Sequence, residues 1–181
     1  MRLDHIAYRV KDRVATSKFF IYALGYKIQQ EFSIQFDDGT SARCMALEPP
    51  EKQIEKAPWT NLAIIDRPYG PCQEYHMPPE IFVSDGPPGS IVGDWVAARN
   101  DIGGIHHIAY QVDSVEKTMA EWKAKGYAEF SSNEPIKCPG LTQVFTRPSA
   151  LTGVIYEFIE RGEHGFCAEN VKNLMEATKG L

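Results

Sequence analysis

The amino-acid sequence predicts an α+β fold built from two tandem βαβββ modules. The main observation is an internal repeat, in which residues 3–10 (LDHIAYRV) return as residues 105–112 (IHHIAYQV) with five of eight positions identical. A second landmark is Ala-Leu-Gly-Tyr at 23–26 and Ala-Lys-Gly-Tyr at 124–127. A third is an apolar run ended by proline, MALEP at 45–49 and FTRP at 145–148. Three landmarks repeated at nearly constant spacing indicate a duplicated module.

The repeated segment opens each module and is predicted to be a strand. Because side chains alternate between the two faces of a strand, His5, Ala7 and Arg9 share one face of the first copy, and the opposite face is more apolar. His107 takes the place of His5 in the second copy. The same alternation predicts that His106 faces away from His107.

A helix is predicted after each repeated strand, at about 14–24 and 115–125. Each of these segments has apolar residues near helical spacing and ends at a glycine, Gly25 or Gly126, which is typical of a helix C-terminus. The apolar face expected for the first helix consists of Val14, Phe19, Phe20 and Ala23.

We interpret the chain as a single domain over residues 1–181. Module one covers 1–100, module two covers 101–162, and the tail at 163–181 is predicted to form an amphipathic helix around Val171, Leu174 and Met175. Residues 49–79 are rich in proline and have no counterpart in module two. We expect this insertion to be a loop that covers the site.

Composition excludes several classes of function. The net charge of −5, without a run of basic residues, argues against a nucleic-acid partner. The sequence has no apolar stretch of about 18 residues and no signal-peptide pattern at its start, so we expect no membrane segment and a cytoplasmic location.

The duplicated strands suggest a metal site. His5 and His107 occupy equivalent positions, so an approximate twofold axis would bring both to a shared centre. Glu157 lies in the apolar last strand, where an ionised carboxylate is costly unless it is paired or bound to a cation. Its counterpart in module one is sought after the insertion, at Glu80, and Glu48 is the competing candidate.

These residues resemble the vicinal oxygen chelate superfamily, which includes glyoxalase I, methylmalonyl-CoA epimerase and 4-hydroxyphenylpyruvate dioxygenase. The resemblance rests on the DHIA and HHIA strands, the two copies and the terminal Tyr-Glu-Phe strand. It implies a cupped mixed sheet around one divalent ion, which could be Co, Mn, Zn, Ni or Fe. The ligands implied are His5, Glu80, His107 and Glu157.

Two members of the superfamily imply different reactions. Residues 103–109 and 115–126 look like methylmalonyl-CoA epimerase, in which a metal polarises a thioester carbonyl while carboxylates move the α-proton. That enzyme uses a glutamate ahead of a glycine as a base. Asp37, before Asp38-Gly39, stands nearest to that position, although it replaces glutamate by aspartate.

The end of the chain looks instead like 4-hydroxyphenylpyruvate dioxygenase. The similar segments are 144–148 and the tail that starts at Glu157. That enzyme uses two histidines and one glutamate and leaves iron positions open for a 2-oxo acid and dioxygen. It is about twice as long as this chain, which counts against a simple identity.

The number of ligands separates these reactions. Four ligands suit an epimerase or isomerase of a small acyl compound, such as a CoA thioester, with Glu80, Glu157 and Asp37 as catalytic residues, and the repeat favours this choice through Glu80. Three ligands suit a dioxygenase of a 2-oxo acid. A third alternative is a protein that only binds a small molecule, as resistance proteins of this superfamily do. The expected partner is an acyl or 2-oxo acid substrate, and a homodimer is kept open.

Overall fold

The computed structural model describes residues 1–49, 79–162, 166 and 168–179. The insertion expected at 49–79, with its predicted covering role, lies outside the described residues except for the two prolines at its ends. The helices and strands in chain order are β1 (Arg2–Val10), α1 (Arg13–Leu24), β2 (Lys27–Gln35), β3 (Ser41–Glu48), β4 (Glu80–Asp85), α2 (Ile91–Ala97), β5 (Gly103–Gln111), α3 (Val115–Ala124), β6 (Ile136–Cys138), β7 (Leu141–Phe145), β8 (Ile155–Arg161) and α4 (Ala168–Ala177).

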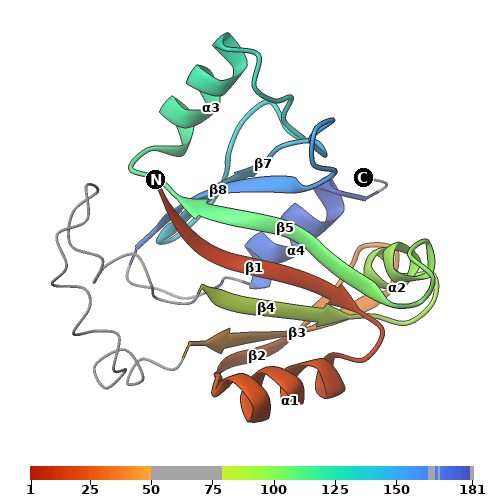
Figure 1. The fold of residues 1–181 in the computed structure, drawn as a ribbon. Helices are drawn as coiled ribbons and strands as arrows, with labels where there is room; N and C mark the ends of the chain where they lie inside the picture. The colour runs from red at the N-terminus through yellow and green to blue at the C-terminus, as the bar shows by residue number, and fades with distance from the viewer. Residues whose placement is uncertain (50–78, 163–165, 167, 180–181) are drawn as a thin grey trace, which may run out of the picture.

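The described strands form one mixed sheet in the order β2-β3-β4-β1-β5-β8-β7-β6. The two strands that carry the repeated sequence, β1 and β5, are antiparallel neighbours at its centre. Each also pairs in parallel with the last strand of its own module, β1 with β4 and β5 with β8. The sheet curls into a cup (Figure 1). The α+β fold of two βαβββ modules with a C-terminal helix is confirmed.

The outer face of the cup is covered by one helix from each module, α1 and α3 (Figure 1). Phe20 of α1 and Met119 of α3 are buried and belong to separate apolar clusters, so each module has its own outer core. In the described part of the chain, no helix has both the length and the apolar character needed to span a lipid bilayer.

The apolar face predicted for α1 is partly wrong. Phe20 is buried, but Val14 and Phe19 are 43% and 59% exposed. Arg13 faces the sheet instead, and its backbone N–H and guanidinium both contact the carboxylate of Asp85 at the end of β4. This polar anchor fixes the rotation of the helix, which a pattern of apolar residues alone does not reveal.

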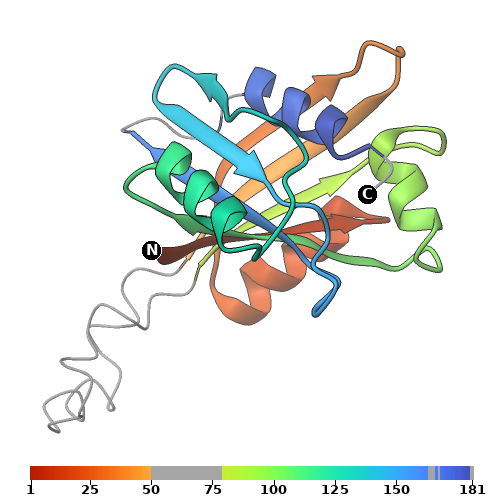
Figure 2. The same ribbon diagram turned by 90° about the horizontal axis from the view of Figure 1, so that it is seen from above.

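The inner, concave face is crossed by α4 (Figure 2), which contacts the strands at both edges of the sheet, β2 and β6. Its predicted apolar stripe of Val171, Leu174 and Met175 is buried. Val171 and Met175 pack in the inner core with Ala7 of β1 and Phe82 of β4. The C-terminal helix therefore closes part of the cup and narrows the space left above the central strands.

The pairing of β1 with β5 contains a β-bulge. Ala7 pairs with His107 and Tyr8 pairs with Ile105, so His106 is an extra residue without a partner position. A bulge of this kind redirects side chains and is frequent beside active sites. In this protein it places two consecutive histidines on the inner side of the cup.

Candidate metal centre and its pocket

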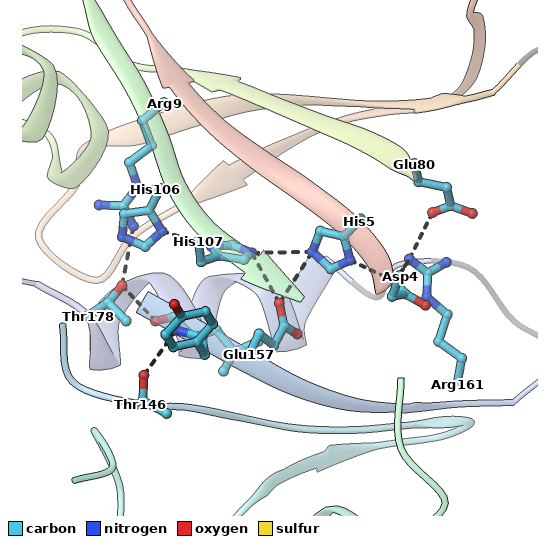
Figure 3. A network of polar contacts seen from close by, with 12 residues as sticks. Asp4, His5, Arg9, Glu80, His106, His107, Thr146, Glu157, Arg161 and Thr178 are labelled. Atoms are coloured by element: carbon cyan, nitrogen blue, oxygen red, sulfur yellow. Dashed lines mark hydrogen bonds and ion pairs between the residues drawn. The ribbon is translucent and has the colours of Figure 1, made fainter. Parts of the chain in front are cut away.

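Three side chains from three adjacent strands meet inside the cup: His5 of β1, His107 of β5 and Glu157 of β8 (Figure 3). The two histidine Nε2 atoms are 3.2 Å apart. Glu157 Oε2 lies 3.3 Å from Nε2 of His5 and 3.1 Å from Nε2 of His107. His5 and Glu157 are each only 1% exposed. The structure thus brings together three of the four residues proposed as ligands.

Sheet pairing explains why these residues meet. In the antiparallel centre, His107 pairs with Ala7, which follows His5 by two residues on the same face. In the parallel pair of module two, Glu157 pairs with Ala109, two residues beyond His107. The small alanines leave room for the longer ligand side chains. The duplicated strand motif and the pairing of β8 are therefore both needed to build the cluster.

The donor atoms fit one metal ion. Nitrogen and oxygen ligands lie about 2.1 Å from ions such as Zn²⁺, so two donors on one ion are separated by roughly 3.0 to 3.4 Å. The three separations of 3.1 to 3.3 Å fall in this range. The second oxygen of Glu157 is also buried, with no hydrogen-bond partner among the described residues. A buried polar atom in this state is expected to have a partner that is not a protein group.

The charges in the cluster also favour a cation. Burial opposes protonation of His5, but the carboxylates of Glu157 and Asp4 outweigh it and raise the pKa of His5 to about 9. Burial lowers the pKa of His107, and the contact with Glu157 only partly offsets this. Burial opposes ionisation of Glu157 as well, yet the two histidines prevail and lower its pKa to about 2. Glu157 is thus a buried carboxylate whose counter-charge a divalent ion can supply.

A chain of ion pairs orients His5 through Nδ1, the ring nitrogen that faces away from the cluster. Its Nδ1 lies 2.7 Å from Oδ1 of Asp4, and Arg161 donates to the same oxygen at 2.7 Å. Arg161 also donates to Glu80 at 2.8 Å. A carboxylate on the far nitrogen of a metal-bound histidine fixes the tautomer that presents Nε2 to the metal. Asp4 has this place, and Arg161 holds Asp4.

The expected role of Glu80 as the fourth ligand requires a correction. In each module the first-strand histidine pairs with one residue of the last strand, which is Glu80 in module one and Ile155 in module two. Glu157 lies two residues beyond Ile155, so its true counterpart is Phe82. The carboxylate of Glu80 is bound to Arg161 instead. The sequence alignment across the insertion was displaced by two residues, and an aromatic ring occupies the fourth ligand position.

Asp37, the predicted base, is also placed away from the cluster. It lies in the turn between β2 and β3, its side chain is 84% exposed, and it forms an ion pair with Lys172 of α4. It does not line the cavity at the cluster. The resemblance placed Asp37 by its position ahead of a glycine, which does not specify where the side chain points in the fold.

His106 was expected on the opposite face from His107, and this expectation is wrong because of the bulge. Its Nδ1 lies 2.8 Å from Nδ1 of His107, it is 4% exposed, and its Nε2 has no hydrogen-bond partner in the part of the chain that is described. Burial, together with the charges of Arg9 and His107, keeps its pKa well below the ordinary value. His106 is therefore a neutral imidazole beside the cluster.

The cluster opens into a small cavity of about 30 Å³. This volume holds an ion with one or two water molecules, and a larger ligand requires the lining side chains to move apart. Three rings form apolar walls: Phe82, Phe145 and Phe166. The polar side chains that line the cavity outside the cluster are those of Arg9, Ser84, His106 and Gln143.

Three residues in or beside the site were not predicted from the sequence as functional: Asp4, Arg9 and Arg161. Asp4 directly precedes His5, so its position behind the ligand was a signal that could have been used. Arg9 was placed on the same face as His5, but its burial depends on α2 and α4, which come from distant segments. Arg161 lies more than 150 residues from Asp4, and no local pattern joins them.

The sequence was compared with the profiles of known protein families and with curated proteins. The sequence profile of the glyoxalase/bleomycin resistance protein/dioxygenase superfamily matches residues 4–138. No curated protein gives a significant match by sequence.

Solved structures share the fold at low sequence identity. A mutant 4-hydroxymandelate synthase from Streptomyces coelicolor has a TM-score of 0.72 and 17% identity, over 98% of this chain and 53% of that chain. This chain thus spans about half the length of that protein. A methylmalonyl-CoA epimerase has a TM-score of 0.63 and 20% identity, over 90% of this chain and 97% of that one. The epimerase from Mycobacterium tuberculosis has a TM-score of 0.61 and 16% identity, over 89% and 88%. Because the profile covers most of the chain, and the fold agrees with it, the protein belongs to the glyoxalase/bleomycin resistance protein/dioxygenase superfamily.

Proposed function

We propose that the protein is a mononuclear non-haem iron dioxygenase that acts on a small 2-oxo acid. The observation that carries the proposal is the set of three ligands, with Phe82 where a fourth would stand. Two histidines and one carboxylate on one side of an ion, with the other positions open, are the ligand set typical of non-haem Fe(II) oxygenases.

The chain's own residues would divide the work as follows. His5, His107 and Glu157 would hold the ion, and the aromatic walls would keep water from the open side. When bound, the iron would supply a redox-active site at which dioxygen reacts, and the 2-oxo acid, as it loses CO₂, would supply two of the electrons that reduce dioxygen. A 2-oxo acid carries two neighbouring oxygen donors, which suits an ion with several open positions.

The epimerase favoured by the repeat loses its main support. An epimerase needs a base beside the metal to remove the α-proton of its substrate. The two candidates, Glu80 and Asp37, are committed to Arg161 and Lys172. Among the described residues that line the cavity, Glu157 is the only carboxylate, and it belongs to the ligand set. The described lining of the cavity therefore offers no second carboxylate for proton transfer.

The test is oxygen uptake by protein loaded anaerobically with Fe(II) and then mixed with a panel of 2-oxo acids. We expect at least one acid to cause oxygen consumption matched by release of CO₂. Zinc-loaded protein and the Glu157→Gln variant serve as controls and should consume none. If no acid supports uptake, while a 2-methyl acyl thioester exchanges its α-hydrogen in D₂O, the epimerase would replace the dioxygenase.

A further inference from the structure

Arg9 is a buried arginine that lacks a carboxylate partner among the described residues. It is 3% exposed, and its one side-chain hydrogen bond to a described residue runs from Nη2 to Oγ1 of Thr178 at 3.2 Å (Figure 3). Its Cζ also lies 5.8 Å from the centre of the Trp95 ring. A guanidinium has five N–H donors, so one hydrogen bond to the described residues leaves most of the hydrogen-bonding capacity of Arg9 to other partners.

Two other arginines with little exposure, Arg13 and Arg161, have their charges neutralised by carboxylates of the protein. Arg13 is 4% exposed and forms ion pairs with Glu31 and Asp85. Arg161 has a side chain 13% exposed and is paired with two carboxylates as well. An unpaired buried charge is costly, because desolvation is not repaid by a counter-charge. Arg9 differs from both because no described carboxylate neutralises its charge. This difference indicates that a bound ligand is its partner.

The position of Arg9 identifies that ligand as the molecule bound at the cluster. Arg9 follows Ala7 by two residues on the inner face of β1, roughly 7 Å along the strand. Ala7 is the partner of His107 in the sheet. Arg9 and all three cluster residues line the same cavity. A molecule that binds the ion at one end would therefore extend toward Arg9 at the other, with the lining side chains moved apart to admit it.

The charge of the cavity supports an acidic ligand with two anionic groups. Glu157 is the only carboxylate among the described lining residues. With a divalent ion in place, Glu157 would leave the metal end with one net positive charge. Arg9 adds a second positive charge at the far end. A ligand that carries a negative charge at each end would neutralise both.

We infer that Arg9 binds a second carboxylate of the substrate, which makes the substrate class the 2-oxo dicarboxylic acids. The 2-oxo acid end of the substrate would face the ion, and this part rests on the proposed function. The distal carboxylate would accept hydrogen bonds from the guanidinium, in the paired geometry that arginine favours. The aromatic walls would contact the carbon chain between the two ends.

The test is calorimetric binding to zinc-loaded protein, which needs neither iron nor oxygen. The probes are 2-oxopentanedioate and 2-oxohexanedioate, compared with 2-oxopentanoate and 2-oxohexanoate of equal chain length. We expect at least one diacid to bind about 100-fold more tightly than its monoacid, as for a buried charge pair. Arg9→Gln should remove this advantage and leave the monoacid affinity within about threefold, and Arg9→Lys should keep part of it.

The matched control is Arg147→Gln, which removes a half-exposed arginine outside the cavity and should leave every affinity unchanged. Equal binding of diacids and monoacids by the natural protein would overturn the inference, even if Arg9→Gln fails to fold. Equal losses for both acid types in Arg9→Gln would also overturn it, because a purely structural arginine gives that result. Diacid preference without oxygen uptake in the iron-loaded protein would sink the dioxygenase and leave the anion site standing. Oxygen uptake with monoacids alone would overturn the anion site at Arg9 and leave the dioxygenase standing.

Discussion

The two modules have the same backbone plan but contribute unequally to the cluster. Module two supplies two of the three candidate ligands, His107 and Glu157, from neighbouring strands β5 and β8. Module one supplies His5 from β1, and its β4 presents Phe82 at the position equivalent to Glu157. Strand pairing is thus preserved in both halves while the ligand set is not.

The duplicated backbone provides equivalent positions in the two modules, and the side chain at each position determines whether a metal ligand is present there. Phe82 faces the inner core and packs with Phe166, with ring centres 5.0 Å apart. Such a ring cannot bind a metal, so the module-one position equivalent to Glu157 supplies an apolar wall in place of a ligand. An ion held mainly from one side is accessible to a substrate from the other, and this asymmetry underlies the proposed function.

The largest effect is expected from removing a ligand on the module-two side. In His107→Ala the lost nitrogen cannot be replaced from a rigid strand, so metal affinity should fall by more than about 100-fold, beyond the range known for outer-shell residues. Metal content after dialysis, measured by mass spectrometry, checks this. His5→Ala should behave in the same way, and exposed Gln29→Ala should retain its metal. Full occupancy in both histidine variants would rule out the cluster as the metal site.

A smaller loss of metal affinity is expected from changing Asp4, which contacts Nδ1 of His5. Asp4→Asn keeps the shape of the side chain but removes the charge that orients the ring of His5, so affinity for Co²⁺ should fall by about 10- to 100-fold. Titration followed by visible absorption measures this fall and reports the ligand geometry. Asp101→Asn is the matched control, because Asp101 is exposed and far from the cavity lining. Equal affinities for the Asp4 variant and the natural protein would remove Asp4 from the site.

The sequence predicted much of this asymmetric site, and the residues that it missed share a physical cause. His5, His107 and the strands around them follow from the repeat, and Glu157 follows from its apolar surroundings. Glu80 was misassigned because the insertion breaks the spacing between β1 and β4, so that only the strand register reveals Phe82. A bulge and long-range ion pairs likewise depend on pairing between distant segments, which a single sequence does not specify.

Metal removal should give a modest change in stability, concentrated in module two. An ion present at 100 times its dissociation constant stabilises the folded state by about 2.7 kcal/mol. For a chain of this length that corresponds to roughly 5 to 10 °C in melting temperature. Calorimetry with and without a chelator checks the size. Hydrogen exchange should show greater gains in protection on metal binding for β5 and β8 than for β4, and equal gains in both halves would contradict the asymmetry.

The most direct test of the central claim compares the two glutamates that the repeat appeared to make equivalent. Isothermal titration with Co²⁺ would be performed on Glu157→Gln and Glu80→Gln, a pair of identical substitutions on β8 and β4. If three ligands hold the ion, Glu157→Gln should weaken binding by more than about 100-fold. Glu80→Gln, which acts only through Arg161 and Asp4, should weaken it by less than about tenfold. Equal losses in the two variants would make Glu80 a fourth ligand and contradict the account.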